Sequence, residues 1–123
     1  MVLVDTSIWI DHFRRTDSQL VEVLDRGDVV MHPFVLGELA LGNITGLDGM
    51  IDDLNRLAQA TVASAAEVLR FIGDRKLSGS GIGYVDAHLL AAAALTPETL
   101  IWTRDKRLFV VARAQSLSVE NWK

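Results

Sequence analysis

The fold class is decided first by the stretch that reads Val2-Leu3-Val4-Asp5-Thr6-Ser7-Ile8-Trp9-Ile10. Its first three residues form a continuous apolar run, as in a central parallel strand that is buried on both faces. An acid and two hydroxyl residues follow, and we expect Thr6 or Ser7 to cap a helix that runs to about Phe13. A buried strand that passes through polar residues into a helix is typical of α/β proteins.

The same alternation of short apolar runs and helical periods continues along the chain. It predicts further strands at 29–31, 61–62, 100–102 and 117–119, and further helices at 18–26, 34–41, 47–57, 64–77, 84–95 and 105–114. Strands that alternate with helices favour a mainly parallel central sheet flanked by helices on both faces. We find no linker, repeat or low-complexity tract, so residues 1–123 are expected to form a single domain.

The composition limits the kind of protein. Half of the 123 residues are hydrophobic and none is cysteine, which excludes disulfides and thiolate metal sites and fits a reducing cytoplasm. The N-terminus has no basic leader, and the longest apolar run, 89–95, is far shorter than the roughly 18 residues of a membrane helix. We therefore expect a cytoplasmic protein that does not enter a membrane.

The charge bears on the possible partners. Lys and Arg number 12 against 16 Asp and Glu, a net charge of −4, which argues against a nucleic-acid coat protein because such proteins are usually basic. Without four of its acids the chain would be electrically balanced. A polyanionic substrate is therefore compatible with this sequence if cations neutralise a pocket that gathers four acids.

Three acids stand where open α/β sheets place their ligand sites, near the carboxyl ends of strands. Asp5 follows the first strand directly, Glu38 lies one turn into the helix after the second strand, and Asp105 lies three residues beyond the strand that ends at Trp102. Asp86 lies in the first turn of an otherwise apolar helix, with apolar residues three, four and seven positions later. Its side chain is therefore expected to project from the buried stripe of that helix.

Each acid taken alone also has a structural explanation. Asp5 and Asp105 could cap the helices that follow them, and Asp86 could interact favourably with the dipole of its helix. Glu38 has the weakest such explanation, because its helix is almost wholly apolar. The combination is harder to explain by local structure than any single acid.

If the four acids converge, they require a cation. Two unit charges about 4 Å apart repel by roughly 4 kcal/mol at an effective dielectric near 20. Several such pairs would exceed the stability of a typical domain, about 5–15 kcal/mol. Oxygen ligands favour Mg²⁺ or Mn²⁺, and such an ion activates a bound water and shields phosphate oxygens. The acids therefore indicate phosphodiester hydrolysis.

Four motifs, in this order and at this spacing, resemble those of PIN-domain nucleases. They are Val2-Leu3-Val4-Asp5-Thr6-Ser7, Leu36-Gly37-Glu38-Leu39, Gly83-Tyr84-Val85-Asp86-Ala87-His88 and Trp102-Thr103-Arg104-Asp105-Lys106. The length and spacing are most similar to the single-domain VapC toxins of prokaryotic toxin–antitoxin pairs. The resemblance extends from residue 2 to about residue 108.

The resemblance implies a PIN-like fold and an endoribonuclease that uses Mg²⁺ or Mn²⁺ to cut single-stranded or looped RNA. Asp5 and Asp86 would be direct metal ligands, and Glu38 and Asp105 would complete the site directly or through water. It also implies homodimers and a cognate antitoxin protein whose C-terminal segment blocks the groove.

Further residues in the motifs are candidates for supporting roles. Thr6 and Thr103 match hydroxyl positions of the family and would support the acids or a substrate phosphate through hydrogen bonds. Arg104 and Lys106 flank Asp105 and could contact phosphates, although surface charge is the default interpretation of both.

Other functions stay open at this point. One is an RNA-maturation or DNA nuclease of the same fold, although the long insertions of flap nucleases are missing. Another is a phospho-receiver signalling domain, which needs a pair of acids after its first strand; here only Asp5 follows that strand. A third is a catalytically silent binding module.

Overall fold

Four parallel strands form the centre of the computed structural model, which describes residues 1–123. The strands are β1 (Val2–Val4), β2 (Val29–Met31), β3 (Ala58–Gln59) and β4 (Leu100–Trp102), in the spatial order β3-β2-β1-β4. Val2 of β1 lies opposite Val29 of β2 and Leu100 of β4. Because these strands are parallel and in this register, their carboxyl ends meet at one edge of the sheet.

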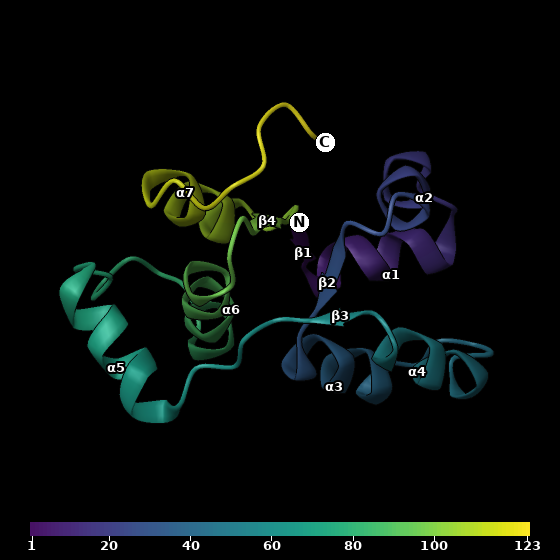
Figure 1. The fold of residues 1–123 in the computed structure, drawn as a ribbon, viewed down its shortest axis with the longest axis horizontal. Coiled ribbons are helices and arrows are strands. Elements are labelled where there is room, and N and C mark those ends of the chain that lie inside the picture. The colour runs from purple at the N-terminus through teal and green to yellow at the C-terminus, as the bar shows by residue number, and fades with distance from the viewer.

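Seven helices surround the sheet. They are α1 (Thr6–Arg14), α2 (Ser18–Asp25), α3 (Pro33–Leu41), α4 (Asp48–Asn55), α5 (Ala65–Asp74), α6 (Tyr84–Leu95) and α7 (Lys106–Ala114). In Figure 1 the strands lie in the middle, with α5, α6 and α7 to their left and α1, α2 and α4 to their right. The predicted α/β class, a parallel sheet with helices on both faces, is thereby confirmed. None of the helices combines the length and the apolar character needed to cross a membrane.

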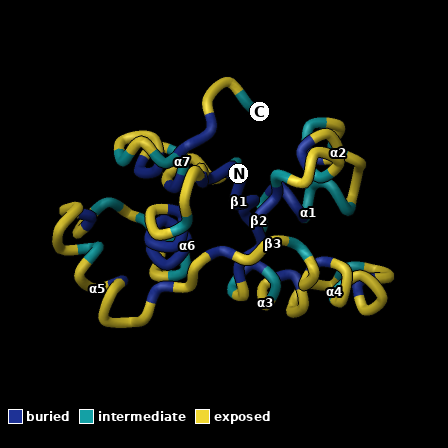
Figure 2. The backbone as a smooth tube through the Cα atoms, viewed as in Figure 1, coloured by how far each residue is buried: buried dark blue, intermediate teal, exposed yellow.

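The core lies along β1, β2, β4 and the helix α6. Figure 2 shows these elements as mostly buried, whereas α2, α4 and α5 expose much of their surface. All three residues of β1 and of β2 are buried, and so are the seven consecutive residues 87–93 of α6. The small alanine side chains of α6 favour the helix and let it pack closely, so its first turn is held near the sheet edge.

One predicted strand lies at a different position. The strand expected at 61–62 is found at Ala58–Gln59, where Ala58 pairs with Val30. The backbone N–H of Thr61 instead donates to the side-chain hydroxyl of Thr96, 2.9 Å away at the end of α6. Val62 is 48% exposed. The β-branched pair has a strand-like sequence, but the chain has already left the sheet when it reaches these residues.

The strand expected at 117–119 forms only in part. A single parallel bridge joins Ser118 to Ile101. Ile101 supplies both hydrogen bonds, from its N–H to the carbonyl of Leu117 at 2.6 Å and from its carbonyl to the N–H of Val119 at 3.0 Å. The segment therefore covers the outer edge of β4 without becoming a fifth strand.

Candidate active site

Asp5 occupies the end of the central strand β1. It is only 7% exposed, and its backbone N–H donates to the carbonyl of Trp102 at 2.9 Å, which extends the pairing of β1 with β4 by one residue. Asp5 is the residue that precedes α1, but its side chain makes no capping hydrogen bond to that helix. The expectation that Thr6 or Ser7 caps this helix is wrong, because both residues already belong to α1.

Two hydroxyl groups hold the carboxylate of Asp5 instead. Ser7 Oγ and Thr103 Oγ1 each donate to Asp5 Oδ2 at 2.8 Å. Oδ1 of Asp5 has no hydrogen-bond partner within the chain. The carboxylate is thus oriented by one oxygen, and the other remains available to a ligand.

Glu38 reaches the same edge from α3. Thr6 Oγ1 donates to Glu38 Oε1 at 2.7 Å, so the residue after Asp5 links α1 to α3. Glu38 is exposed, in contrast to Asp5. A long acidic side chain on an apolar helix is therefore held towards the site by a hydroxyl partner 32 residues away.

Asp105 enters from the turn between β4 and α7. Its Oδ1 accepts from the backbone N–H of Leu108 at 2.9 Å, which makes it the N-cap of α7. Its own backbone N–H donates to Thr103 Oγ1 at 3.0 Å. The helix-cap interpretation is thus confirmed for one oxygen, while Oδ2 has no partner in the chain and stays free for a second role.

Asp86 shows that the four acids share one electrostatic environment. Burial, followed by the negative charges of Asp5 and Asp105 and more weakly of Glu38, raises the pKa of Asp86 from 3.8 to about 6, although the Gly83 backbone opposes the shift. Like charges nearby favour the neutral acid, because ionisation would add repulsion to the cost of desolvation. Burial and the neighbouring charges therefore both favour the protonated form of Asp86.

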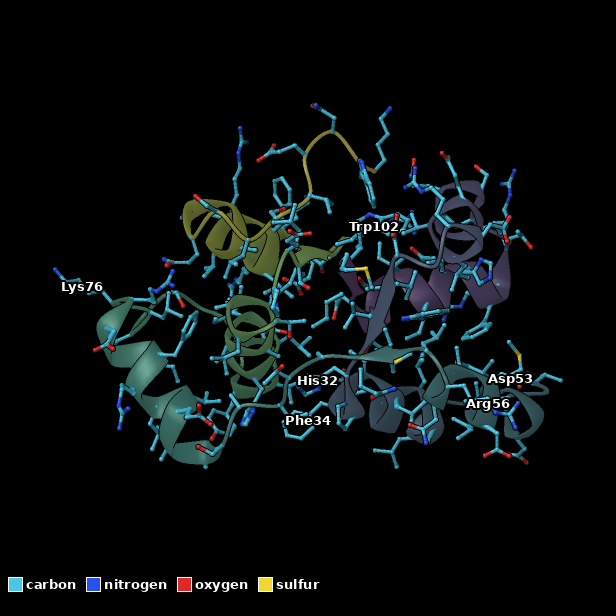
Figure 3. The ribbon with its side chains drawn as sticks, viewed as in Figure 1. His32, Phe34, Asp53, Arg56, Lys76 and Trp102 are labelled. Atoms are coloured by element: carbon cyan, nitrogen blue, oxygen red, sulfur yellow. The ribbon has the colours of Figure 1, made fainter.

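Aromatic contacts connect the helices that carry Glu38 and Asp86. His32 and Phe34, at the start of α3, lie between α3 and α6 in Figure 3. The Phe34 ring lies 4.6 Å from the ring of His88 on α6 and 5.1 Å from that of His32. This packing holds the start of α3 against α6.

The acids do not form a closed metal cage. No three His, Asp or Glu side chains are close enough to enclose an ion by themselves, even though the charges of the other three acids reach Asp86. The two observations agree if the carboxylates surround an open site, within electrostatic range but not in mutual contact. Mg²⁺ suits such a site because it keeps several waters and needs only one or two direct carboxylates. The hard oxygen donors and the raised pKa of Asp86 thus fit a divalent cation.

Comparison with known proteins places this arrangement in a family. The sequence profile described as "PIN domain" matches residues 2–114, a range that contains all four acids. The chain belongs to the PIN-domain family.

Two curated relatives of this PIN domain carry the same name, "Ribonuclease VapC32", from Mycobacterium tuberculosis strains CDC 1551 / Oshkosh and ATCC 25618 / H37Rv. Each is 50% identical over 108 residues, which cover 88% of this chain and 87% of the relative. No solved structure matches the chain significantly. Membership of the PIN family, together with the single acid after β1, disfavours a phospho-receiver.

The structure adds one residue to the site of the PIN domain that the sequence did not single out. Ser7 donates to Asp5 and accepts from the backbone N–H of Arg104 at 3.2 Å. It thereby connects the turn after β1 to the turn after β4. The signal is present in the sequence, since two hydroxyl residues follow Asp5, but the sequence predicts only a helix-capping role for Ser7.

The basic residues beside Asp105 lie in different surroundings. Arg104 Nη1 donates to Asp11 Oδ2 at 2.8 Å and Nη2 contacts Asp17, while the guanidinium lies 5.7 Å from the ring centre of Trp102. Trp102, labelled in Figure 3, is buried. Lys106 is exposed and forms no ion pair. A phosphate contact from Arg104 would have to compete with two carboxylates, whereas the exposed side chain of Lys106 has no such competitor.

Proposed function

We propose that this PIN domain, acting as a single domain over the whole chain, is a metal-dependent endoribonuclease that hydrolyses phosphodiester bonds in single-stranded or looped RNA. The observation that carries the proposal is the gathering of Asp5, Glu38, Asp86 and Asp105 at one sheet edge, where burial and the charges of the other three acids raise the pKa of Asp86. The ribonuclease name of the relatives that are 50% identical supports RNA as the substrate.

The direct metal ligands in this proposal are Asp5, through its free Oδ1, and Asp86. Glu38 and Asp105 complete the site directly or through water. When bound, Mg²⁺ or Mn²⁺ would lower the pKa of a coordinated water and shield the phosphate oxygens. Although its pKa is raised to about 6, Asp86 is mostly ionised at neutral pH, and a bound cation would favour its charged form further.

The remaining polar groups of the site position these acids. Thr103 and Ser7 orient Asp5 through its Oδ2, so that Oδ1 keeps its direction as a ligand. Thr6 does the same for Glu38. Because hydroxyl groups hold Asp5 and Glu38 and a backbone N–H holds Asp105, no cation of the chain neutralises these carboxylates, and their negative charge is left for the metal.

We further propose that the protein is the toxin of a type II toxin–antitoxin system, on the basis of the VapC name of its relatives. Its partners would then be a cognate antitoxin, which blocks the groove, and a second copy of the chain in a homodimer. The toxin would cleave its RNA substrate in the cytoplasm. An RNA-maturation or DNA nuclease of the same fold is the alternative.

The test is cleavage of single-stranded RNA and DNA by the purified chain with Mg²⁺, with Mn²⁺ and with EDTA. We expect RNA to be cut in the presence of metal, and the cleavage to be lost in Asp5→Asn and Asp86→Asn variants that remain folded. Binding of Mn²⁺, followed by calorimetry without RNA, provides a readout that does not depend on activity. Cleavage retained by both variants would refute the metal site, and a preference for DNA would favour the alternative.

A further inference from the structure

A hollow of about 470 Å³ lies beside Glu38, between α1 and the segment that follows α3. It is lined by Ile10, Phe13, Arg14, Glu38, Gly42, Asn43, Ile44 and Thr45. Among the four acids only Glu38 borders it, and Thr6, the hydrogen-bond partner of Glu38, directly follows Asp5. The hollow therefore adjoins the acidic site but has walls of its own.

One wall of the hollow is apolar and firmly held. Ile10, Phe13 and Ile44 are each partly buried and pack against the hydrophobic core. The Phe13 ring also stacks on Trp9, with ring centres 6.0 Å apart and planes 24° from parallel. Because Trp9 is buried, the orientation of Phe13 is set before any ligand arrives.

The other wall is polar and has no partner within the chain. Arg14, Asn43 and Thr45 are exposed, and their side chains form no hydrogen bond or ion pair. An asparagine amide offers both donors and an acceptor, and an arginine offers a planar cation. Groups of this kind match the edge and the face of a heterocyclic base.

We propose that this hollow binds one unpaired nucleobase of the RNA, next to the phosphate that is cut, and that Asn43 reads the edge of the base. The inference rests on the proposed ribonuclease function. Proteins that recognise RNA by sequence stack unpaired bases on aromatic or guanidinium planes and form hydrogen bonds with the base edges. Phe13 or Arg14 provides the plane and Asn43 the edge contacts.

The character of the hollow favours a base over other occupants. A phosphate would need more positive charge than one arginine beside Glu38 supplies. An apolar segment of a protein partner would need a mainly apolar groove, but only three of the eight lining residues are hydrophobic. The volume lies within the roughly 300–1,000 Å³ that is usual for small-ligand sites.

The experiment uses a pool of RNA with a randomised single-stranded segment, cut by the purified chain and sequenced at the cleaved ends. For Asn43→Ala we expect the nucleotide preference at one position beside the cut to disappear, while the preferences elsewhere persist. The kcat/KM for the preferred sequence should fall roughly tenfold. Asn43 is exposed and without partners, so the variant is expected to fold. Asn55→Ala, the same change at the exposed end of α4, is the matched control.

Three outcomes would overturn the subsite: a sequence preference that Asn43→Ala leaves intact, a uniform loss of cleavage at all sequences, or an identical change in Asn55→Ala. An unchanged preference together with weaker binding of a protein partner would assign the hollow to that partner instead. If the unmodified chain cuts no RNA at all, the proposed function fails together with the subsite. If the chain cuts RNA normally and Asn43→Ala does not alter the sequence preference, only the subsite fails.

Discussion

Replacing Asp86 by asparagine removes one negative charge from the site and nearly preserves the shape of the side chain. In the metal-free protein we expect Asp86→Asn to unfold at higher urea concentration than the unmodified chain at pH 7.5. The same variant should no longer cleave RNA with Mn²⁺. A substitution that abolishes activity and raises stability is the expected signature of a charge kept for ligand binding.

The magnitude follows from the pKa of Asp86. Burial and the neighbouring acids raise that pKa from 3.8 to about 6, and each pKa unit corresponds to about 1.4 kcal/mol. The upper limit is therefore about 3 kcal/mol. Asp86 is only half-buried, and since solvent screens its repulsion, we expect a gain in the free energy of unfolding of about 1–2 kcal/mol.

The effect depends on pH in a defined direction. Because folding raises the pKa of Asp86, the folded state holds this proton more tightly than the unfolded state. The stabilisation that follows from the proton is complete below pH 3.8 and is lost as the pH rises through about 6. The difference between the variant and the unmodified chain should therefore be near zero at pH 3.5 and largest above pH 7.

The assay is urea denaturation followed by circular dichroism in EDTA, at several pH values between these limits. Asp52→Asn, which removes an exposed acid of α4, is the control and should change the free energy of unfolding by less than about 0.5 kcal/mol. Adding Mg²⁺ should stabilise the unmodified chain more than the Asp86→Asn variant, because an ion that binds only the folded state shifts the equilibrium towards it. An Asp86→Asn variant that is no more stable than the unmodified chain at pH 7.5, or that gains equally at all pH values, would refute the repulsion argument.

Two further predictions concern groups that position the acids. Thr103→Val removes the buried hydroxyl that donates to Asp5, so it should lower kcat and lower the free energy of unfolding by about 1–3 kcal/mol. The control Thr99→Val removes a buried hydroxyl remote from the acids and should lower stability alone. Equal kcat values in the two variants would contradict the positioning role of Thr103. Arg104→Ala and Asp17→Asn break the same ion pair. If Arg104 acts by holding the turn between β4 and α7, both variants should lower kcat and leave the salt dependence of RNA binding unchanged. A weaker salt dependence in Arg104→Ala alone would identify a phosphate contact.

The element order could be predicted because it follows from local patterns. Val2–Val4, Val29–Met31 and Leu100–Trp102 are short apolar runs that each end at a polar residue, and each is a strand in the structure. The position of β3 could not be predicted, because Ala58–Gln59 is a strand only through its pairing with β2 and both of its residues are exposed. The β-branched residues 61–62 fit a strand by propensity but have no partner strand beside them.

For the site, the sequence by itself determined which side chains can do the chemistry. Asp5 and Asp105 follow strands at positions that the apolar runs define, and the motifs around Glu38 and Asp86 carried the family resemblance. The tertiary structure decided which partners from distant parts of the chain hold these residues. Thr103, which donates to Asp5, lies 98 residues from it along the chain, and Asp11, which accepts from Arg104, lies 93 residues from its partner. Hydrogen bonds and charge interactions depend on distance in space, and only the pairing of β1 with β4 and the packing of α1 beside them bring these groups within reach.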